Sequence, residues 1–341
     1  MTKKESKQMN VGDYWRNRKV LVTGAGGFIG SHLSEVLAEK GAMVRALVRY
    51  SSSQDMGCLK YIPVHLRNRV ELVKVDLPEA EILRTVTEGT SVIFHLAAIV
   101  DTGYELLTPS MIIKNDTCGL LNLLSAAIDS KIERFVYVSS WEVYGNPLQF
   151  PTRENSPLVA LSVDAASKIA GEKIVESYAN RYAIDAVIVR PFSVYGPRQN
   201  PKAIIPTIIR QIVASEEVRL GKRDNERDFI YVQDVVEGLM RLGSTKNAMG
   251  KAVNLGTGKS FRVDDVVKMV CSLAGKEHAA VQFDPTRLRI SAGDVAKAQA
   301  CIDLLKELTG WGAETPLDKG LDMTIRWYAT TGYAKEQGLC Q

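Results

Sequence analysis

Short apolar runs alternate with longer amphipathic stretches over the first 190 residues of the chain. The short runs are rich in valine, isoleucine and leucine and predict buried strands, at 20–23, 43–48, 70–75, 91–98, 134–139 and 186–190. The longer stretches carry apolar residues at helical spacing and predict helices, from Phe28 onward and at 109–130 and 162–181. Strands that alternate with helices are typical of a parallel, doubly wound sheet. We therefore predict an α/β fold whose ligands lie at the carboxyl ends of the strands.

A glycine-rich turn joins the first strand to the first helix. Gly24, Gly27 and Gly30 have the spacing G-x-x-G-x-x-G. A tight turn without side chains lets a pyrophosphate approach bare backbone, and the helix N-terminus offers N–H groups and a positive dipole end to that anion. Because a strand precedes the turn and a helix follows it, the spacing is typical of a dinucleotide-binding site.

The second strand ends where a dinucleotide fold often holds the adenosine ribose with an acid. Here Val48 stands near that place and is followed by Arg49 and by Ser51–Ser53. A cation and hydroxyls suit a 2′-phosphate, but Arg49 fits equally well as a solvated residue or as one that stacks on adenine. This stretch therefore leaves both NAD and NADP open.

Beyond Pro191 the pattern changes to prolines, short strands and shorter helices. We interpret this part as a smaller mixed α/β lobe that closes over the first domain. The predicted organisation is a disordered tail over 1–16, a dinucleotide-binding domain over 17–190 to which 229–258 partly returns, a substrate-binding lobe over 191–330, and a C-terminal tail over 331–341.

Composition and charge narrow the function classes. The chain has 341 residues and a net charge of +4, which is too small and dispersed to indicate nucleic acid but suits an anionic substrate. No apolar run reaches the roughly 18 residues of a membrane span, and 1–10 lacks the apolar core of a signal peptide. The five cysteines and four histidines lack metal-ligand spacing, and scattered thiols are typical of the cytoplasm. We therefore expect a cytoplasmic protein without a metal site.

Several motifs occur in an order that resembles one known family. They are Gly24-x-x-Gly27-x-x-Gly30, His95-Leu-Ala-Ala98, Ser139-Ser140-x-Glu142-Val143-Tyr144-Gly145, Arg190-Pro-Phe-Ser-Val-Tyr-Gly-Pro-Arg198, Arg227-Asp-Phe-Ile-Tyr-Val-Gln-Asp234 and Asn254-Leu-Gly-Thr-Gly258. The chain thereby resembles the extended short-chain dehydrogenase/reductases of the NAD-dependent epimerase/dehydratase family, over residues 17–330. Stretches 44–50 and 203–209 look most like nucleotide-sugar 4,6-dehydratases, with epimerases and UDP-glucuronate decarboxylases as close relatives.

This resemblance implies a Rossmann-type domain, a tightly held NAD(P) and a nucleotide-diphosphate sugar of the UDP or dTDP type. It also implies a homodimer, to which the helices at 109–130 and 163–181 could contribute. The implied cofactor positions are Gly24, Gly27, Phe28, Ile29, Gly30, Arg49, Asp76, Leu77, Leu96, Ala97, Ala98, Lys168 and Pro191. Asn115 and Asn122, together with Asp76, match structural or adenine-side positions.

In the family, bound nicotinamide takes a hydride from sugar C4 and a 4-keto intermediate forms. A Tyr-x-x-x-Lys pair normally supplies the base, with both side chains on one helix face, and a serine helps to hold the hydroxyl. By position, Ser140 is that serine and Lys168 is that lysine, but Asp164 stands in place of the tyrosine. A carboxylate is a weaker base than a tuned phenolate.

Three interpretations of Asp164 are open. Either it is a substitution that removes most of the turnover, or it is a natural change that moves the base elsewhere or alters the reaction, or it belongs to a protein that binds its ligands without catalysis. As a structural residue, Asp164 is an acid in a first helical turn, four residues before a lysine, which is mildly stabilising.

Glu142 is the next residue that separates the possible reactions. The resemblance implies that it removes the C5 proton in a dehydratase, whereas simple 4-epimerases usually lack it; otherwise it is a polar residue at a strand end. Trp141 precedes it, and an indole cannot act as a general acid. Tyr104, Tyr144 and Tyr195 are possible substitute phenols, of which the last two are better explained as packing residues.

Substrate anchoring is predicted from charge. Arg227 and Arg289 match family positions that contact a nucleotide diphosphate, and guanidinium groups suit such an anion. Arg198 could join them, and an ion pair with Asp228 or Asp234 is the alternative for Arg227. The implied substrate contacts are Tyr104, Ser140, Trp141, Ser193, Arg198, Arg227 and Arg289.

Overall fold

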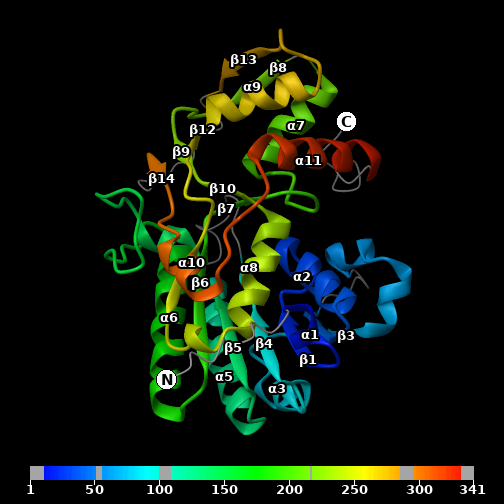
Figure 1. The fold of residues 1–341 in the computed structure, drawn as a ribbon, viewed down its shortest axis with the longest axis vertical. Coiled ribbons are helices and arrows are strands. Elements are labelled where there is room, and N and C mark those ends of the chain that lie inside the picture. Colours follow the sequence, from blue (N-terminus) through cyan, green and yellow to red (C-terminus); the bar gives the residue numbers. More distant parts are fainter. Residues whose placement is uncertain (1–10, 51–55, 100–108, 216, 285–294, 332–341) are drawn as a thin grey trace, which may run out of the picture.

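The computed structural model describes residues 11–50, 56–99, 109–215, 217–284 and 295–331. A seven-stranded sheet in the order β11-β6-β5-β4-β1-β2-β3 forms the centre of the molecule (Figure 1). Its strands are β1 (Lys19–Thr23), β2 (Met43–Val48), β3 (Val70–Lys74), β4 (Val92–His95), β5 (Arg134–Val138), β6 (Ala186–Pro191) and β11 (Ala252–Leu255). Neighbouring strands are parallel throughout, which confirms the predicted fold class. The strand order reverses between β1 and β4, and ligands of such sheets bind at that point.

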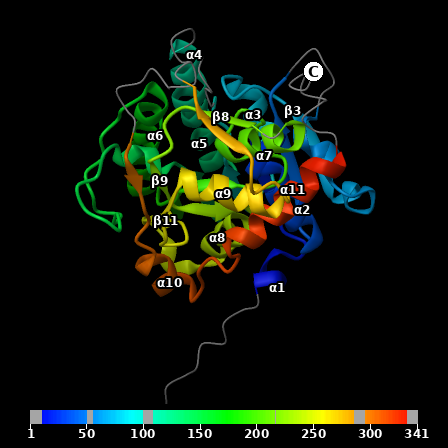
Figure 2. The same ribbon diagram turned by 90° about the horizontal axis from the view of Figure 1, so that it is seen from above.

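Helices cover both faces of the sheet (Figures 1 and 2). One core contains residues of α1 (Val11–Trp15), α2 (Phe28–Glu39), α8 (Val232–Ser244) and α10 (Asp303–Thr309). The other contains residues of α3 (Ala80–Thr87), α5 (Gly119–Asp129) and α6 (Val163–Tyr182). Val20 and Val22 of β1 belong to the first core and Leu21 to the second. Successive strand residues point to opposite faces, so a strand covered on both sides is apolar throughout.

The predicted helix at 109–130 contains an irregularity. It begins as α4 (Pro109–Ile113), passes through a π-helical turn over Lys114–Cys118, and continues as α5. Ile113 and Gly119 on either side keep right-handed helical backbone, so the helix is not broken. Hydrogen bonds that span one more residue rotate the following side chains around the helix axis, which a regular helical pattern does not predict.

The helix predicted at 162–181 corresponds to α6. Ser162 precedes it with extended backbone, and its Oγ accepts a hydrogen bond from the N–H of Ala165 at 3.0 Å. This is the N-cap that the sequence predicts. Because the cap fixes where the first helical turn begins, it also fixes the face on which Asp164 and Lys168 lie.

The remaining elements build a lobe that has its own hydrophobic core and lies beyond the carboxyl ends of the central strands (Figure 1). Its helices are α7 (Ile204–Ala214), α9 (Val263–Leu273) and α11 (Leu317–Thr331). Its strands are β7 (Ser193–Tyr195) paired with β10 (Phe229–Tyr231), β8 (Glu217–Leu220) paired with β13 (Ala280–Phe283), and β9 (Glu226–Arg227) between β12 (Phe261–Arg262) and β14 (Lys297–Ala298). Short 3₁₀ turns occur at Gly57–Tyr61, Val64–Arg69, Trp141–Tyr144 and Lys246–Ala248.

The N-terminal segment differs from its prediction as a disordered tail through residue 16. Val11–Trp15 form α1, and the Trp15 side chain is fully buried with its ring 5.6 Å from that of Phe94. Because the first ten residues are polar and rich in lysine, composition predicts disorder and does not reveal that Trp15 is buried.

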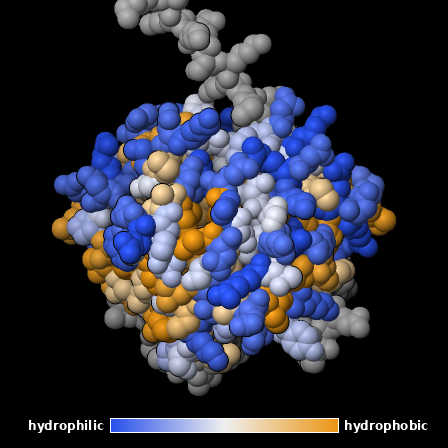
Figure 3. Space-filling view, turned by 90° about the horizontal axis from the view of Figure 1, so that it is seen from below, coloured by the Kyte–Doolittle hydropathy of each residue, from blue (hydrophilic) through white to orange (hydrophobic). Residues whose placement is uncertain are grey.

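The face opposite the lobe is largely hydrophilic with hydrophobic residues between (Figure 3). None of the helices in the described ranges is both long and apolar enough to cross a membrane.

Candidate active site

The glycine turn after β1 closes tightly on itself and on the end of β4. A Cβ atom on Gly30 would lie 2.2 Å from the carbonyl oxygen of Gly24. A Cβ atom on Gly24, whose φ is +67°, would lie 2.8 Å from the nitrogen of Ala97. No described side chain caps α2 at Gly27, so its first N–H groups are left for an anion. This bare backbone, followed by Phe28 and Ile29, fits a dinucleotide.

Thr23 and His95 fix the chain that leaves β4 beside this loop. Thr23 Oγ1 is hydrogen bonded to His95 Nδ1 at 2.8 Å and accepts from the N–H of Ala97 at 3.2 Å. Burial, and then the nearby charge of Lys168, lowers the pKa of His95 to about 3, so its imidazole is neutral near pH 7. Leu96–Ala98 are half-buried here. Sequence reasoning missed Thr23, because a hydroxyl at a strand end carries no distinctive pattern.

The ends of β2 and β3 meet on the predicted adenosine side. Arg49 is exposed, and Asp76 Oδ1 accepts a hydrogen bond from the backbone N–H of Tyr50 at 3.3 Å. Leu77, next to Asp76, is buried. The hydroxyls of Ser51–Ser53 lie outside the described residues, so this stretch still leaves the presence of a 2′-phosphate open.

Two asparagines predicted at structural or adenine-side positions both donate side-chain hydrogen bonds. Asn122 Nδ2 donates to the carbonyl oxygens of Leu77 and Pro78, at 3.2 and 3.1 Å. Asn115 Nδ2 donates to Asp116 Oδ1 at 2.8 Å. Sequence reasoning missed Asp116, which the π-helical turn buries.

The carboxyl end of β5 carries the serine and the acid predicted for catalysis. Ser140 has extended backbone, and its Oγ accepts a hydrogen bond from the N–H of Glu142 at 3.2 Å. This bond starts the turn at Trp141–Tyr144 and keeps Glu142 half-buried at the sheet edge. Ser139 Oγ instead donates into the interior, to Glu172 Oε1 at 2.6 Å.

Lys168 reaches from α6 to the same edge. Its Nζ donates to the carbonyl oxygen of Val138 at 3.2 Å and lies 5.5 Å from the ring centre of Tyr137. Burial lowers the pKa of Lys168, against the opposing effect of nearby carboxylates, first Asp116 and then Asp164. The structure therefore brings Lys168 next to the strand end that carries Ser140.

Asp164 lies one helical turn before Lys168 and on the same face of α6. It is half-buried, and its backbone carbonyl accepts a hydrogen bond from Ser167 Oγ at 2.8 Å. Its charge acts on Lys168, as does the charge of Glu142. A carboxylate thus stands where the resemblance implies a phenol, beside the lysine that would tune that phenol.

The two described tyrosines considered as substitutes are engaged elsewhere. The Tyr144 hydroxyl donates to Asn254 Oδ1 at 2.6 Å and accepts from Arg190 at 2.8 Å, and burial raises its pKa to about 12. The Tyr195 hydroxyl donates to the carbonyl oxygen of Leu317 at 3.2 Å, and burial raises its pKa as well. Both are packing residues, as the sequence predicted. Tyr104 lies outside the described residues.

A buried ion pair between Arg190 and Glu172 lies next to the residues around Ser140 and Lys168. Glu172, which is fully buried on α6, accepts hydrogen bonds from Arg190 Nε at 2.9 Å and Arg190 Nη2 at 2.6 Å. Arg190 belongs to β6 and also donates to the carbonyl oxygen of Glu154 at 2.9 Å. Because Ser139 bonds the same carboxylate, this pair ties α6 to β5 and β6. The sequence motif that begins at Arg190 points to this arginine, but no pattern in the sequence identifies Glu172 as its partner.

Trp141 contacts two residues from later parts of the chain. Its ring stacks on Phe192 with centroids 6.3 Å apart, and the Arg227 guanidinium carbon lies 5.3 Å from the ring centre. Arg227 Nη1 donates to the carbonyl oxygen of Glu226 at 2.9 Å. Asp228, the acid considered as its alternative partner, accepts backbone hydrogen bonds from Thr257, Gly258 and Ala300.

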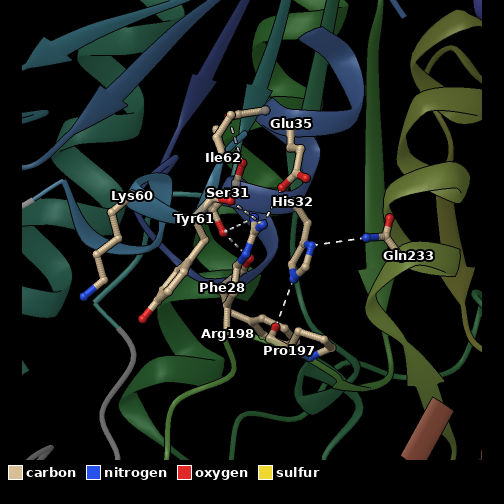
Figure 4. A network of polar contacts seen from close by, with 12 residues as sticks. Phe28, Ser31, His32, Glu35, Lys60, Tyr61, Ile62, Pro197, Arg198 and Gln233 are labelled. Carbon is tan, nitrogen blue, oxygen red and sulfur yellow. Dashed lines mark hydrogen bonds and ion pairs between the residues drawn. The ribbon is translucent and has the colours of Figure 1, made fainter. Parts of the chain in front are cut away.

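Arg198 is placed away from this cluster, in a network that joins α2 to the lobe (Figure 4). It is 6% exposed, and its guanidinium forms an ion pair with Glu35 and contacts Ser31. His32 lies in the same network, with Nε2 2.9 Å from the carbonyl oxygen of Pro197. Burial and the Arg198 charge lower the pKa of His32 to about 3. The structure thus gives Arg198 a partner on the cofactor helix, and its contact with substrate stays a prediction.

Two of the remaining predicted positions lie on β6 and β7, and the third lies outside the described residues. Pro191 ends β6 and is buried, and Ser193 begins β7 and is half-buried, with its N–H bonded to the carbonyl oxygen of Asp228 at 2.9 Å. Arg289 lies outside the described residues, so only Arg227 of the two predicted diphosphate arginines can be located.

The Rossmann-type sheet, the glycine loop and the Ser140–Lys168 edge define an extended short-chain dehydrogenase/reductase. The family model described as "NAD dependent epimerase/dehydratase family" matches residues 20–256, and the chain belongs to this family. NAD is therefore its cofactor, and the glycine loop fits it.

Relatives carry names from both branches of the family. The chain is 29% identical to a UDP-glucose 4-epimerase of Mycolicibacterium smegmatis, over 91% of this chain and 98% of the relative. It is 28% identical to the dTDP-D-glucose 4,6-dehydratase of Mus musculus, over 91% and 88%. A solved UDP-glucuronic acid 4-epimerase from Bacillus cereus, in complex with UDP-glucuronic acid and NAD, superimposes with a TM-score of 0.82 at 26% identity, covering 91% of this chain and 99% of that one.

Proposed function

We propose that the protein is an NAD-dependent nucleotide-sugar 4,6-dehydratase that works through a 4-keto intermediate. The observation that carries the proposal is the place of Glu142. Its backbone N–H donates to Ser140 Oγ, and the residue lies half-buried at the end of β5, where Lys168 Nζ donates to the carbonyl oxygen of Val138. Loss of water between C5 and C6 needs a base for the C5 proton, and Glu142 is the acid that the turn after β5 presents there. An epimerase that only rotates a ketone needs no such base.

Each residue of the cluster has a part in this scheme. Bound NAD supplies the acceptor for the C4 hydride. Ser140 holds the 4-hydroxyl, Asp164 accepts its proton, and Lys168 stabilises the charge on that side. Once C4 is a ketone, the C5 proton is acidic enough for Glu142 to remove, and the same carboxyl then gives a proton to the departing 6-hydroxyl, since Trp141 cannot. The balance closes when C6 takes back the hydride that left C4 and C5 takes a proton, so that the sugar would lose one water in total and NAD would end oxidised.

The substrate proposal is a nucleotide-diphosphate sugar of the UDP or dTDP type. Arg227, which the ring of Trp141 holds near the sheet edge, has the charge for the diphosphate. The relatives named above act on sugars of both types. The homodimer and the cytoplasmic location stay predictions alongside this one.

Asp164 favours a second candidate of another class, a protein that binds NAD and a nucleotide sugar without turnover. A carboxylate beside Lys168 is a poor match to the base that hydride removal needs, and neither of the two described candidates, Tyr144 and Tyr195, replaces it. Epimerisation or C6 decarboxylation remains the enzymatic alternative, because both share the 4-keto intermediate.

Mass spectrometry separates these candidates. The purified protein is first denatured to identify any nucleotide sugar that it carries, and fresh protein is then incubated with a panel of UDP- and dTDP-sugars. Dehydration removes the mass of one water, decarboxylation removes that of carbon dioxide, and epimerisation gives a new stereoisomer of unchanged mass. Bound sugar that is recovered unchanged from every mixture would support the non-catalytic candidate.

A further inference from the structure

Arg198 lies on the segment that follows β7 and is buried against α2 (Figure 4). Its backbone is left-handed, with a φ of +66°, which is an unfavourable conformation for a residue with a Cβ atom. A residue keeps such a conformation only where the surrounding contacts fix it, and such residues cluster at functional sites. A buried cation also needs a compensating charge. The contacts that meet both needs show what Arg198 holds in place.

The guanidinium of Arg198 reaches two other elements. Its Nη2 forms an ion pair with Glu35 of α2 and donates to the carbonyl oxygen of Tyr61, in the 3₁₀ turn at Gly57–Tyr61, at 3.5 Å. Its Nη1 donates to Ser31 Oγ, also on α2, at 3.5 Å. The ion pair is the strongest of these contacts because it is close and charged. The side chain thus bonds both α2 and the 3₁₀ turn.

The backbone around Arg198 adds contacts to the same two elements. His32 Nε2, on α2, lies 2.9 Å from the carbonyl oxygen of Pro197 and must donate to it, because a carbonyl only accepts. His32 Nδ1 then accepts from Gln233 Nε2 of α8 at 3.2 Å. Cys58 Sγ, in the 3₁₀ turn, donates to the carbonyl oxygen of Arg198 at 3.7 Å. Main-chain and side-chain contacts therefore hold the same arrangement.

The first of these elements, α2, is the helix that follows the glycine loop. It begins at Phe28, directly after Gly27, and Glu35 lies about two turns further on. The N–H groups at its start are those that fit the pyrophosphate of NAD. A bond to Glu35 therefore acts on the helix whose N-terminus would bind the cofactor.

The 3₁₀ turn contacts the glycine loop itself. The N–H of Cys58 donates to the carbonyl oxygen of Gly26 at 2.8 Å. A Cβ atom on Gly57 would lie 2.3 Å from the same oxygen, so the turn and the loop are in direct contact. Arg198 therefore reaches the loop by two routes, through α2 and through this turn.

We propose that Arg198 is a positioning residue for NAD, which holds α2 and the 3₁₀ turn so that the glycine loop keeps the shape that receives the pyrophosphate. A loop that is already held in its bound shape loses less conformational freedom when its ligand binds. This role differs from the substrate contact that the sequence predicts for Arg198. The two roles give opposite results when the cofactor and the nucleotide are measured separately.

The test uses the full-length protein with its NAD bound. The release of NAD is followed by exchange into an excess of isotopically labelled NAD, and the affinity for UDP or dTDP, whichever the unaltered protein binds more tightly, is measured by calorimetry. Arg198→Met removes the guanidinium but keeps a Cβ atom and an apolar stem, so the backbone cost at this position is unchanged. We expect NAD to leave about tenfold faster and the affinity for the nucleotide to stay the same. Unchanged release of NAD, or a loss of nucleotide affinity, would overturn the proposal.

A second variant acts from α2 and has a matched control. Glu35→Gln removes the charge that Arg198 pairs with and should also speed the release of NAD. Asp185→Asn removes the partner of Arg134, a buried arginine at the start of β5, at the opposite end of the strands from the glycine loop. The two pairs are buried alike, with side chains 7% and 17% exposed for Arg198 and Glu35 and 5% and 26% exposed for Arg134 and Asp185.

The comparison of these two variants separates positioning from general stability. Both changes should lower the urea midpoint of unfolding, because each leaves a buried arginine without its carboxylate, but only Glu35→Gln should speed the release of NAD. Equal release from both variants would contradict the positioning role, also if Arg198→Met does not fold. The release of NAD does not depend on which reaction the protein catalyses, so this test is independent of the proposed dehydration.

Discussion

Replacement of Glu172 by glutamine tests whether the buried ion pair below the active site holds α6 in place. The carboxylate is fully buried and receives two bonds from Arg190, at 2.9 and 2.6 Å, and one from Ser139 at 2.6 Å. Glutamine has the same shape, so the change removes the charge and leaves the Arg190 cation uncompensated. Removal of one partner of such a pair costs about 3–5 kcal/mol. This is a large fraction of the roughly 5–15 kcal/mol that stabilises a typical folded domain.

The same helix offers a matched control. Glu176 pairs with Lys173 at 2.8 Å, but its side chain is 39% exposed, and exposed pairs of this kind contribute about 0.2–1 kcal/mol. Urea unfolding followed by tryptophan fluorescence gives both free energies of unfolding. We expect Glu172→Gln to lose several times more than Glu176→Gln. Equal losses would refute the claim that the interior charge pair anchors α6.

Three further predictions concern the reaction and its cofactor. Asp164→Tyr should raise turnover by about 10²–10⁴-fold, because it replaces a weak carboxylate base by a phenol that Lys168 can tune; a variant that is no faster in product formation would contradict the claim that the carboxylate is the poorer base. Glu142→Gln should leave formation of reduced nicotinamide intact while loss of water stops, as stopped-flow absorbance and product mass together report; if neither step changes, Glu142 is outside the mechanism. Gly30→Ala should abolish NAD binding measured by calorimetry, because its Cβ would meet the Gly24 carbonyl oxygen at 2.2 Å, and retained affinity would contradict the geometry of the loop.

The sequence predicts the sheet, the glycine turn and the places of Ser140 and Lys168 because these depend on local patterns. Buried strands are apolar runs, the glycine turn has a fixed spacing, and Ser162 is a recognisable N-cap, so the positions of Ser140 and Lys168 follow. Asp164 and Glu142 were likewise identified from their places within motifs.

The remainder depends on contacts between segments far apart in the chain. The role of Glu172 depends on its ion pair with Arg190, which lies on β6. Arg198 pairs with Glu35 on α2, which lies 163 residues earlier in the sequence. Asp116 is buried only because the helix contains a π-helical turn, which is not a feature of hydrophobic periodicity. Trp15 anchors a segment whose composition suggests disorder. The roles of such residues are determined by tertiary packing, and no local sequence pattern predicts them.

The most direct test of the central claim uses a nucleotide sugar that carries deuterium at C4. If the protein is a dehydratase that works through a 4-keto intermediate, mass spectrometry of quenched mixtures will find the label transiently in bound NAD and then in a sugar product lighter by one water. A product of unchanged mass that keeps the deuterium at C4 would identify an epimerase instead. Sugar recovered unchanged, with no label in the cofactor, would contradict catalysis altogether.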